Sequence, residues 1–330
     1  ENCKELAKGV YDNYEVRIEG LGGTNPEITS TGYGPSDSYY REIKVNLEES
    51  GLFNYAAFGD SSVTLGGNGT TDSYDSSEGD YGGDNVGSNG DVGTNGDQDG
   101  AVTVNGDNAQ VNGDASTGPA GTIEGEENIT GAKTQNNNFQ LSAVSIPSDL
   151  SGLSDGGGMH LSNDDDSDSL SAGDYQFSSI RISGGTLTLN GTVRIYLTDS
   201  HSLTISGGGS LVVNGQLMLY VSGDCNVGGS GIVNDSGVPS NLIVYSTLES
   251  NGESNGFTLS GNSAFYGAVY APNANMAVSG DGDIYGALVG KTVNISGNGD
   301  IHYDEALQEI GETVYTITGW KETRNPYSLE

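Results

Sequence analysis

Carboxylate side chains are the groups in this sequence with the clearest capacity for chemistry. The 330 residues include 45 Asp and Glu but only 11 Lys and Arg, which gives a net charge of -34. Carboxylates, Asn side chains and turn carbonyls are the hard oxygen ligands that Ca²⁺ prefers. The densest acidic groups therefore predict Ca²⁺ as the cofactor. They supply seven candidate ligands: Asp164, Asp165, Asp166 and Asp168 in one run, and Asp72, Asp75 and Asp80 in another.

Neither acidic group matches a calcium motif of defined spacing. Both differ from the twelve-residue loop between two helices and from the glycine-rich nonapeptide repeat that binds calcium. A solvated surface loop is the alternative interpretation of residues 163–168. Bound cations remain attractive because they would offset the self-repulsion of so much negative charge.

The histidines do not predict a catalytic site. They are His160, His201 and His302, and none lies near a nucleophile in a recognisable motif. A polysaccharide lyase needs a basic residue to abstract a proton, but the basic residues of the region 179–307 are scattered: Arg181, Arg194 and Lys291. Asp is so frequent that no carboxylate pair for glycoside hydrolysis stands out. We expect that the protein is not an enzyme, and a calcium-dependent polysaccharide-active enzyme is the third of three hypotheses.

The two cysteines are Cys3 and Cys225. They are too few for a disulfide framework and too far apart for a metal motif. A single disulfide between them, within one chain or between two, is the interpretation we favour, and it suits an exported protein. Two unpaired thiols are the alternative.

The charge distribution argues against some partners. Between Val45 and Ile180, 23 acidic residues accompany one basic residue, Lys133. Such a surface repels the phosphates of nucleic acids and anionic lipid headgroups. No stretch approaches the ~20 apolar residues of a membrane-spanning helix. Because the sequence starts at Glu1, we expect that a leader or an N-terminal anchor was removed.

The elements that must position these residues are clearest in residues 179–307, where a hydrophobic-Ser-Gly triplet recurs. Its copies begin at Ile182, Ile205, Val221, Leu259, Val278 and Ile295. Several spacings are 17 to 19 residues or a multiple of 18. This predicts an all-β protein whose short parallel strands stack as a β-helix, or β-solenoid, with about 18 residues per rung.

A tyrosine column supports the same register. Tyr266, Tyr285 and Tyr303 are 19 and 18 residues apart, so we expect their rings to stack on successive rungs. His302 adjoins this column, and a stacked position in the wall is a better interpretation for it than a catalytic base.

Residues 53–178 are rich in Gly, Asn and Asp. An Asn-Gly-Asp tripeptide begins at Asn89, Asn95, Asn105 and Asn112. Asn-Gly is a turn signal because both residues tolerate positive φ. With single valines between the turns, the pattern predicts a further part of the β-helix with acidic loops. A flexible linker is the alternative that composition alone would favour.

The two ends of the chain, residues 1–52 and 308–330, differ from the repeats. Helix formers in residues 3–10 predict the end of a short helix, and alternation in residues 14–20 and 40–47 predicts antiparallel strands. The alternating stretch 313–318 and Trp320 predict a strand that caps the open end of the rungs. Pairing of that strand with the N-terminal strands or with another subunit is the alternative.

Several motifs in order resemble the PilX-type pilus-assembly proteins of bacteria. They are residues 72–76 with Tyr81, the Asn-Gly-Asp repeats, and the segments 265–274, 280–287 and 301–307, so the match covers roughly residues 53–307. The resemblance implies a β-helix at the bacterial cell surface. It also implies pilus components as partners and an N-terminal pilin-like hydrophobic helix, which this sequence does not contain.

We therefore predict an extracellular structural protein. It is either a subunit that assembles with itself into a surface filament or a pilus-associated component. Exchange of terminal strands would join subunits, and the candidate assembly residues are Val16, Ile18, Tyr315, Ile317 and Trp320. A monomeric surface adhesin or glycan-binding module that uses exposed tyrosines is the alternative.

Overall fold

The chain forms two units. The computed structural model describes residues 7–11, 14–20, 26–33, 40–250, 256–310 and 314–324. Residue contacts assign residues 1–52 and 311–330 to the smaller unit and residues 53–310 to the larger unit. The larger unit therefore lies, in sequence, between the two parts of the smaller one.

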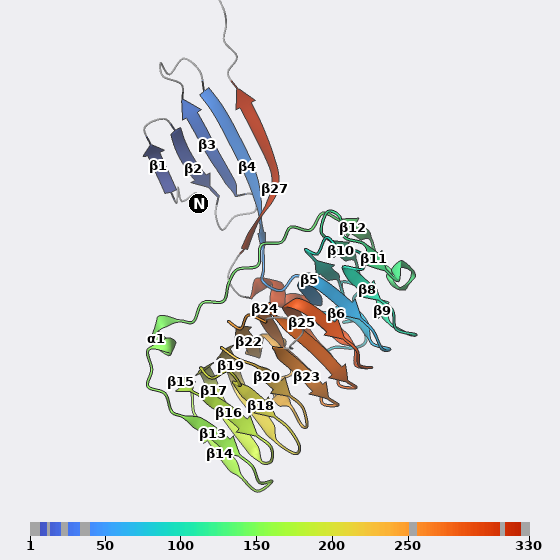
Figure 1. The fold of residues 1–330 in the computed structure, drawn as a ribbon, viewed down its shortest axis with the longest axis vertical. Coiled ribbons are helices and arrows are strands. Elements are labelled where there is room, and N and C mark those ends of the chain that lie inside the picture. Colours follow the sequence, from blue (N-terminus) through green and yellow to red (C-terminus); the bar gives the residue numbers. More distant parts are fainter. Residues whose placement is uncertain are drawn as a thin grey trace, which may run out of the picture. The chain divides into compact units, whose positions relative to one another are not determined.

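The smaller unit is an antiparallel sheet of five strands in the order β1-β2-β3-β4-β27 (Figure 1). The strands are β1 (Ala7–Tyr11), β2 (Tyr14–Glu19), β3 (Glu27–Tyr33), β4 (Tyr40–Ser50) and β27 (Val314–Arg324). The C-terminal strand β27 pairs with β4 from Val314↔Ser50 to Arg324↔Arg41. The last strand therefore pairs with an N-terminal strand, as in the alternative interpretation, and not with the open end of the rungs.

The predicted helix end is wrong for residues 7–10. They belong to β1, in which Ala7 pairs with Ile18 and Tyr11 with Tyr14. Helix propensity is a weak preference, and pairing with a neighbouring strand overrides it here. Residues 1–6, which include Cys3, lie outside the described residues.

The larger unit is a large sheet in which all the named strand pairs are parallel (Figure 1). This confirms a mostly β protein with an extensive parallel sheet. Its first strands are β5 (Ala57–Leu65), β6 (Thr70–Tyr74), β7 (Val92–Thr94), β8 (Val102–Val104), β9 (Gln110–Val111), β10 (Ala115–Thr117), β11 (Ile123–Glu124) and β12 (Lys133–Gln135). The later strands are β13 (Gly158–Leu161), β14 (Ser167–Leu170), β15 (Gly173–Phe177), β16 (Ser179–Ile182), β17 (Thr186–Leu197), β18 (Leu203–Ile205), β19 (Ser210–Val221), β20 (Cys225–Val227), β21 (Ile232–Asn234), β22 (Leu242–Ser246), β23 (Phe257–Gly261), β24 (Phe265–Gly280), β25 (Ile284–Ile295) and β26 (Ile301–Asp304).

Helices are short and sit between strands. They are the single-turn α1 (Ser148–Ser151) and the 3₁₀ turns η1 (Glu126–Asn128), η2 (Pro239–Asn241) and η3 (Glu305–Glu309).

Buried aliphatic columns run through the stacked strands. In one column the directly paired residues are Ile182, Ile205, Val227, Leu259, Val278, Ile295, Leu65 and Val104. All are buried. Five of the six triplets that the sequence shows lie in this column, whereas Val221 pairs with Leu197 in another wall. Each residue of the column therefore packs on the equivalent residue of the layers above and below it.

The repeat is less regular than the sequence predicts. Met276 and Val293 are paired at a spacing of 17 residues, but Leu187 pairs with Leu211 and Leu217 with Leu242, at spacings of 24 and 25. Long strands such as β17 and β19 run along two walls in succession, which lengthens each layer. The value of about 18 residues therefore fits the layers near residues 257–301 and is too small for the layers between Leu187 and Leu242.

The order of layers in space differs from their order in sequence. Strand β5 pairs with β25 on one side and with β7 and β8 on the other. Strand β26 lies between β25 and β6. We call this junction of β5 and β6 with β25 and β26 the seam. It joins the first strands of the larger unit to its last strands.

A long connection makes this order possible. From β12, residues 136–157 lead past the seam to β13 at the other end of the stack (Figure 1). Phe139 packs on Phe58, with ring centroids 5.5 Å apart, and the Ser142 carbonyl accepts a 2.8 Å hydrogen bond from the Tyr270 hydroxyl. Further along, Asp149 in α1 lies 2.6 Å from the Arg194 guanidinium. The chain then adds layers back towards the seam.

Candidate functional site

The seam places a row of ring and carboxylate side chains on one face of the sheet. Tyr266 pairs with Tyr285, Tyr285 with His302, and His302 with Asp72. Directly paired residues project from the same face of a sheet. Strand pairing alone therefore brings Asp72 to His302, although the two residues are separated by 230 positions in the sequence.

Gly286 allows these strands to approach closely. It lies beside Gly267, has a φ of 142°, and a Cβ built on it would meet the Gly267 carbonyl oxygen at 1.9 Å. A side chain at this position would force the layers apart, so the Tyr-Gly pair in each strand is required for the stacked tyrosines next to it.

His302 is held by a chain of hydrogen bonds. Its Nδ1 lies 2.6 Å from Asp72 Oδ1, and the Tyr81 hydroxyl donates a 2.6 Å hydrogen bond to Asp72 Oδ2. The Tyr81 ring also packs on the imidazole, with centroids 3.8 Å apart. Since a carboxylate accepts hydrogen bonds, Nδ1 carries the proton in the bond to Asp72, which leaves Nε2 as the ring nitrogen that could bind a metal ion.

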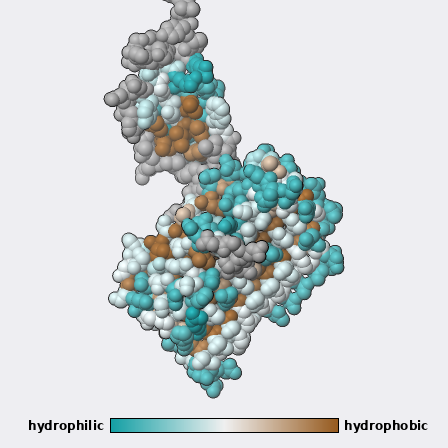
Figure 2. Space-filling model, in the orientation of Figure 1, coloured by the Kyte–Doolittle hydropathy of each residue, from teal (hydrophilic) through white to brown (hydrophobic). Residues whose placement is uncertain are grey.

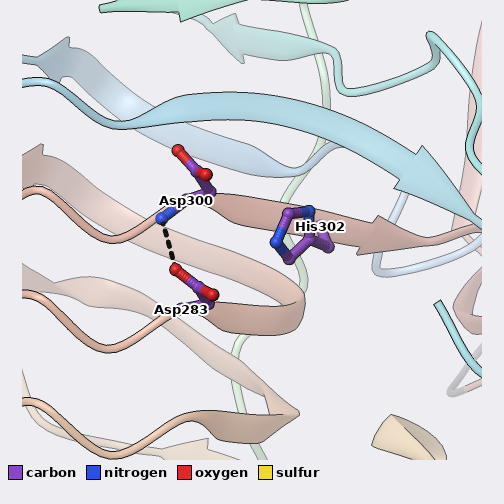
Figure 3. A group of neighbouring side chains, drawn as sticks. All are labelled: Asp283, Asp300 and His302. Carbon is purple, nitrogen blue, oxygen red and sulfur yellow. Dashed lines mark hydrogen bonds between the residues drawn. The ribbon is translucent and has the colours of Figure 1, made fainter. Parts of the chain in front are cut away.

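Two further carboxylates lie beside His302 (Figure 3). Asp283 and Asp300 each come immediately before a strand, β25 and β26 respectively. The Asp300 amide donates a 3.0 Å hydrogen bond to Asp283 Oδ1. Asp300 Oδ1 in turn accepts from the amide and the hydroxyl of Thr70, at 2.6 and 3.0 Å. Both carboxylates are thus fixed by backbone donors of the corners.

Asp283, Asp300 and His302 can offer three metal ligands. One ligand atom from each residue lies within 4.8 Å of the others, and His302 is only 4% exposed. Among the residues that the structure describes, this is the group of three or more His, Cys, Asp or Glu side chains that could hold a metal ion. Two carboxylate oxygens and an imidazole nitrogen suit a divalent transition metal.

Tyrosines surround this group. Tyr266 and Tyr285 stack with centroids 4.2 Å apart and an interplanar angle of 5°, and Tyr81 and Tyr74 pack edge-on against Tyr285. Burial raises the pKa of Tyr285 to about 12, and it also raises the pKa of Tyr74 and Tyr81. The phenols therefore stay protonated at neutral pH, which makes them packing groups and poor bases.

The third member of the tyrosine column is His302 and not Tyr303. Tyr285 pairs with His302, so Tyr303 projects to the opposite side, where it is buried and its hydroxyl donates a 2.7 Å hydrogen bond to the Phe53 carbonyl. A shift of one residue moves a side chain to the other face of a strand. The predicted stacked wall position of His302 thus agrees with its ring contacts.

The predicted calcium ligands of residues 163–168 do not form a multidentate group. Asp164, Asp165 and Asp168 are exposed. The Asp166 carboxylate accepts hydrogen bonds from the amides of Asn163 and Ser162, at 2.9 Å each, which lower its pKa. It closes the turn before β14 and is already engaged by local donors.

The other predicted ligands, Asp72, Asp75 and Asp80, do not form such a group of metal ligands either. Asp72 lies in the seam and bonds His302. Asp75 Oδ1 accepts from the Ser77 amide, while the Asn85 side chain donates to the carbonyls of Asp75 and Asp80. Asn85 thus organises the loop after β6.

Sequence reasoning missed Asp283 and Asp300. A signal was present, because both stand before a strand that starts with Ile and an aromatic or His residue, in Asp-Ile-Tyr and Asp-Ile-His, at a spacing of 17 residues. A repeat that carries an acid at each corner places those acids in adjacent layers.

The structure does not contain the expected disulfide. Cys225 is a free, fully buried thiol in β20, between Leu203 and Phe257 of the neighbouring layers. Burial raises its pKa well above the usual thiol range. Cys3 lies outside the described residues. Cys225 therefore acts as a small core residue.

The other two histidines and Arg194 lie at the surface or in ion pairs. His160 is exposed, and His201 Nδ1 lies 3.3 Å from Asp224 Oδ2 with most of its ring in solvent. Arg194 holds Asp149 of α1 and Asp174 of β15, which ties the long connection to the stack.

The five-stranded sheet has an apolar face. Ile18, Ile28, Val45 and Trp320 are paired in one row across four strands. Val16 and Ile43 lie two residues away on the same face, and Trp320 is 68% exposed. Figure 2 shows this patch in brown on the smaller unit. The other candidate assembly residues, Tyr315 and Ile317, lie in β27 and pair through their backbones with Glu49 and Leu47 of β4.

Within the described ranges, no helix has both the length and the apolar composition needed to cross a membrane.

Comparisons with known proteins give a family and a distant structural similarity. The profile of a domain of unknown function, DUF7305, matches residues 103–310. No curated protein matches the chain. The crystal structure of the competence-associated pilin ComZ from Thermus thermophilus is similar over 94% of this chain and 84% of its own, with 10% sequence identity and a TM-score of 0.26. A similarity at this level carries no argument about fold or function.

Proposed function

We infer that this chain, which belongs to the DUF7305 family of domains of unknown function, is a pilus-associated structural component of the bacterial surface and not an enzyme. The observation that carries this proposal is the apolar face of the five-stranded sheet. A sheet with one apolar face buries that face against a second layer in a folded assembly.

The two faces of the sheet differ strongly in polarity. The row of Ile18, Ile28, Val45 and Trp320 lies on one face. The positions next to these residues in each strand, Arg17, Thr29, Lys44 and Lys321, project to the other face. Such alternation is typical of a sheet covered on one side only. The apolar side is the surface that a partner would cover.

We propose an apolar helix of a pilin-type subunit as the partner on this face. The resemblance to PilX-type proteins implies pilus components with hydrophobic helices. A second copy of this chain is the weaker candidate because each copy carries a net charge of -34, and two such copies repel each other. A helix with few charges avoids this repulsion and supplies the second layer.

We further propose that the larger unit is a closed β-solenoid that acts as an extracellular module. Each of several walls contributes a buried column, such as those through Ile182 and through Leu219, which supports layers that wind around a single core. The acidic surface of this unit favours a soluble, cation-rich environment over contact with nucleic acid.

Site-specific photo-crosslinking in the native host tests the proposed function. A photoreactive phenylalanine analogue replaces Trp320, on the apolar face, and in a second strain it replaces the adjacent exposed Lys321, on the polar face. We expect the analogue at position 320 to crosslink to a pilin-type subunit, identified by mass spectrometry of the isolated adduct. The analogue at position 321 should give at least tenfold less adduct.

Two outcomes contradict the proposal. Equal crosslinking from both positions would mean that the apolar face has no dedicated partner. An adduct that contains only a second copy of this chain would replace the pilin-type partner by self-assembly.

A further inference from the structure

We propose that Asp283, Asp300 and His302 bind one divalent transition-metal ion of the Zn²⁺ type at the seam. The site differs from the calcium loops that the acidic runs suggested. It combines residues from the corners before β25 and β26 with the imidazole at the start of β26.

His302 is the observation that distinguishes this group from an ordinary cluster of acids. The side chain is 4% exposed, and its Nδ1 is engaged by Asp72. No described residue forms a hydrogen bond with its Nε2, which faces the two carboxylates (Figure 3). An imidazole nitrogen beside two carboxylates can share either a proton or a cation with them.

Asp72 is the residue that would orient the imidazole. Histidines that bind metals almost always donate their other N–H to a carboxylate, a carbonyl or water, which fixes the tautomer and increases ligand basicity. Asp72 accepts from His302 at 2.6 Å and is itself held by the Tyr81 hydroxyl at 2.6 Å. The hydrogen bonds that orient the imidazole are therefore present without a metal ion.

The two aspartates are oriented in the same manner. Asp283 and Asp300 each use Oδ1 for backbone donors, so Oδ2 of each residue is available as a ligand. The ligand atoms of the three residues lie within 4.8 Å of one another. Zinc bonds of ~2.0–2.1 Å in tetrahedral geometry place ligand atoms roughly 3.3 Å apart. Side-chain adjustments of about 1.5 Å or less would therefore complete the site.

The donor set decides the class of metal. Imidazole nitrogen suits Zn²⁺ and other first-row transition metals, whereas Ca²⁺ takes six to eight oxygen ligands. Three protein ligands leave a position for water. A divalent ion would balance the charge of the two carboxylates, which would remove the local repulsion between Asp283 and Asp300.

Such an ion would act as a clamp on the seam. It would join the corners of two adjacent layers, and through Asp72 it would also connect to β6 in the first part of the unit. An ion that binds the folded chain and not the unfolded chain raises the stability of the folded state. Metal binding would therefore stabilise the junction between the first and last strands of the larger unit.

Metal binding by the full chain tests the proposal directly. The purified protein is stripped with a chelator, and ZnCl₂ binding is measured by isothermal titration calorimetry and by metal analysis after gel filtration. We expect one Zn²⁺ per chain and a rise in the thermal midpoint on loading. Asp283→Asn and Asp300→Asn should each weaken binding at least tenfold, because the amide oxygen still accepts the backbone hydrogen bonds but the charged ligand is lost.

Two matched controls separate this site from surface binding. His201→Gln removes an exposed histidine that also lies beside an aspartate, and Asp281→Asn removes a carboxylate bonded to the Asn298 side chain. Both variants should bind Zn²⁺ like the wild type. Absence of Zn²⁺ binding at concentrations below about 100 µM would overturn the proposal. So would binding of Zn²⁺ by the Asp283→Asn variant with the affinity of the wild type. Tighter binding of CaCl₂ than of ZnCl₂ at these residues would overturn the choice of metal.

Discussion

Leu65 offers a direct test of the seam. It is 1% exposed and lies in the aliphatic column between Ile295 of β25 and Val104 of β8. Leu65→Ala removes about three methylene equivalents, which costs about 2.4 kcal/mol of transfer free energy at ~0.8 kcal/mol each. The cavity left between two stacked layers raises the expected loss to roughly 3–4 kcal/mol.

Urea unfolding of the full chain, followed by far-ultraviolet circular dichroism, measures this loss. The matched control is Val233→Ala on β21, where the side chain is 37% exposed and the expected change is under ~0.5 kcal/mol. Hydrogen exchange adds the location of the effect: protection should fall in both β8 and β25, because Leu65 supports both strands. A loss of unfolding free energy under about 1 kcal/mol, or a loss of protection confined to β8, would refute the pairing of β5 with β25 at the seam.

Three further predictions concern buried polar groups of the larger unit. Tyr303→Phe leaves the Phe53 carbonyl without its hydroxyl donor, so unfolding free energy should fall by about 1–3 kcal/mol; an unchanged urea midpoint would contradict that hydrogen bond. Burial raises the pKa of Asp304, so the folded chain binds this proton more tightly than the unfolded chain does, and its stability increases as the pH falls through the raised pKa towards the usual carboxyl range. The thermal midpoint of the wild type should therefore rise relative to that of Asp304→Asn as the pH falls from neutral towards that range, and a difference that is independent of pH would refute the assignment. The buried Cys225 thiol should not react with Ellman's reagent in a folded Cys3→Ser variant and should react fully in urea; rapid reaction of the folded protein would show that the thiol is accessible.

Local patterns in the sequence predicted the strands well. The alternation in residues 14–20 and 40–47 corresponds to β2 and β4. The hydrophobic-Ser-Gly triplets identify a column that runs through the larger unit, because a buried position on a parallel stack repeats the same residue type in each layer. Patterns of this kind depend on neighbours that are one layer apart.

The order of the layers could not be predicted from such patterns. Ala57 pairs with Leu288 and Asp72 with His302, and nothing local distinguishes these partners from other apolar strands. The helix end expected at residues 3–10 is wrong for residues 7–10 for a related reason, since pairing of Ala7 with Ile18 decides the conformation there.

The candidate site was missed because the number of acids in a short stretch of sequence does not show which carboxylates lie close together in the fold. The run Asp164–Asp168 is dense but mostly exposed, whereas Asp283 and Asp300 are acids that the 17-residue repeat places in adjacent layers. His302 was recognised as a stacked wall residue, but its carboxylate partners come from corners and from a strand 230 positions away. The site therefore required the strand register.

The measurement that tests the central claim most directly is immunogold electron microscopy of intact host cells. An epitope inserted at Gly237, a half-buried turn residue at which an added Cβ would meet open space, marks the chain in the wild type and in a Trp320→Glu variant. We predict label along surface pili in the wild type, and loss of that label in the variant while the amount of folded protein is unchanged. Label seen only after permeabilisation, or pilus label that is unaffected by Trp320→Glu, would contradict a pilus-associated component that docks through its apolar face.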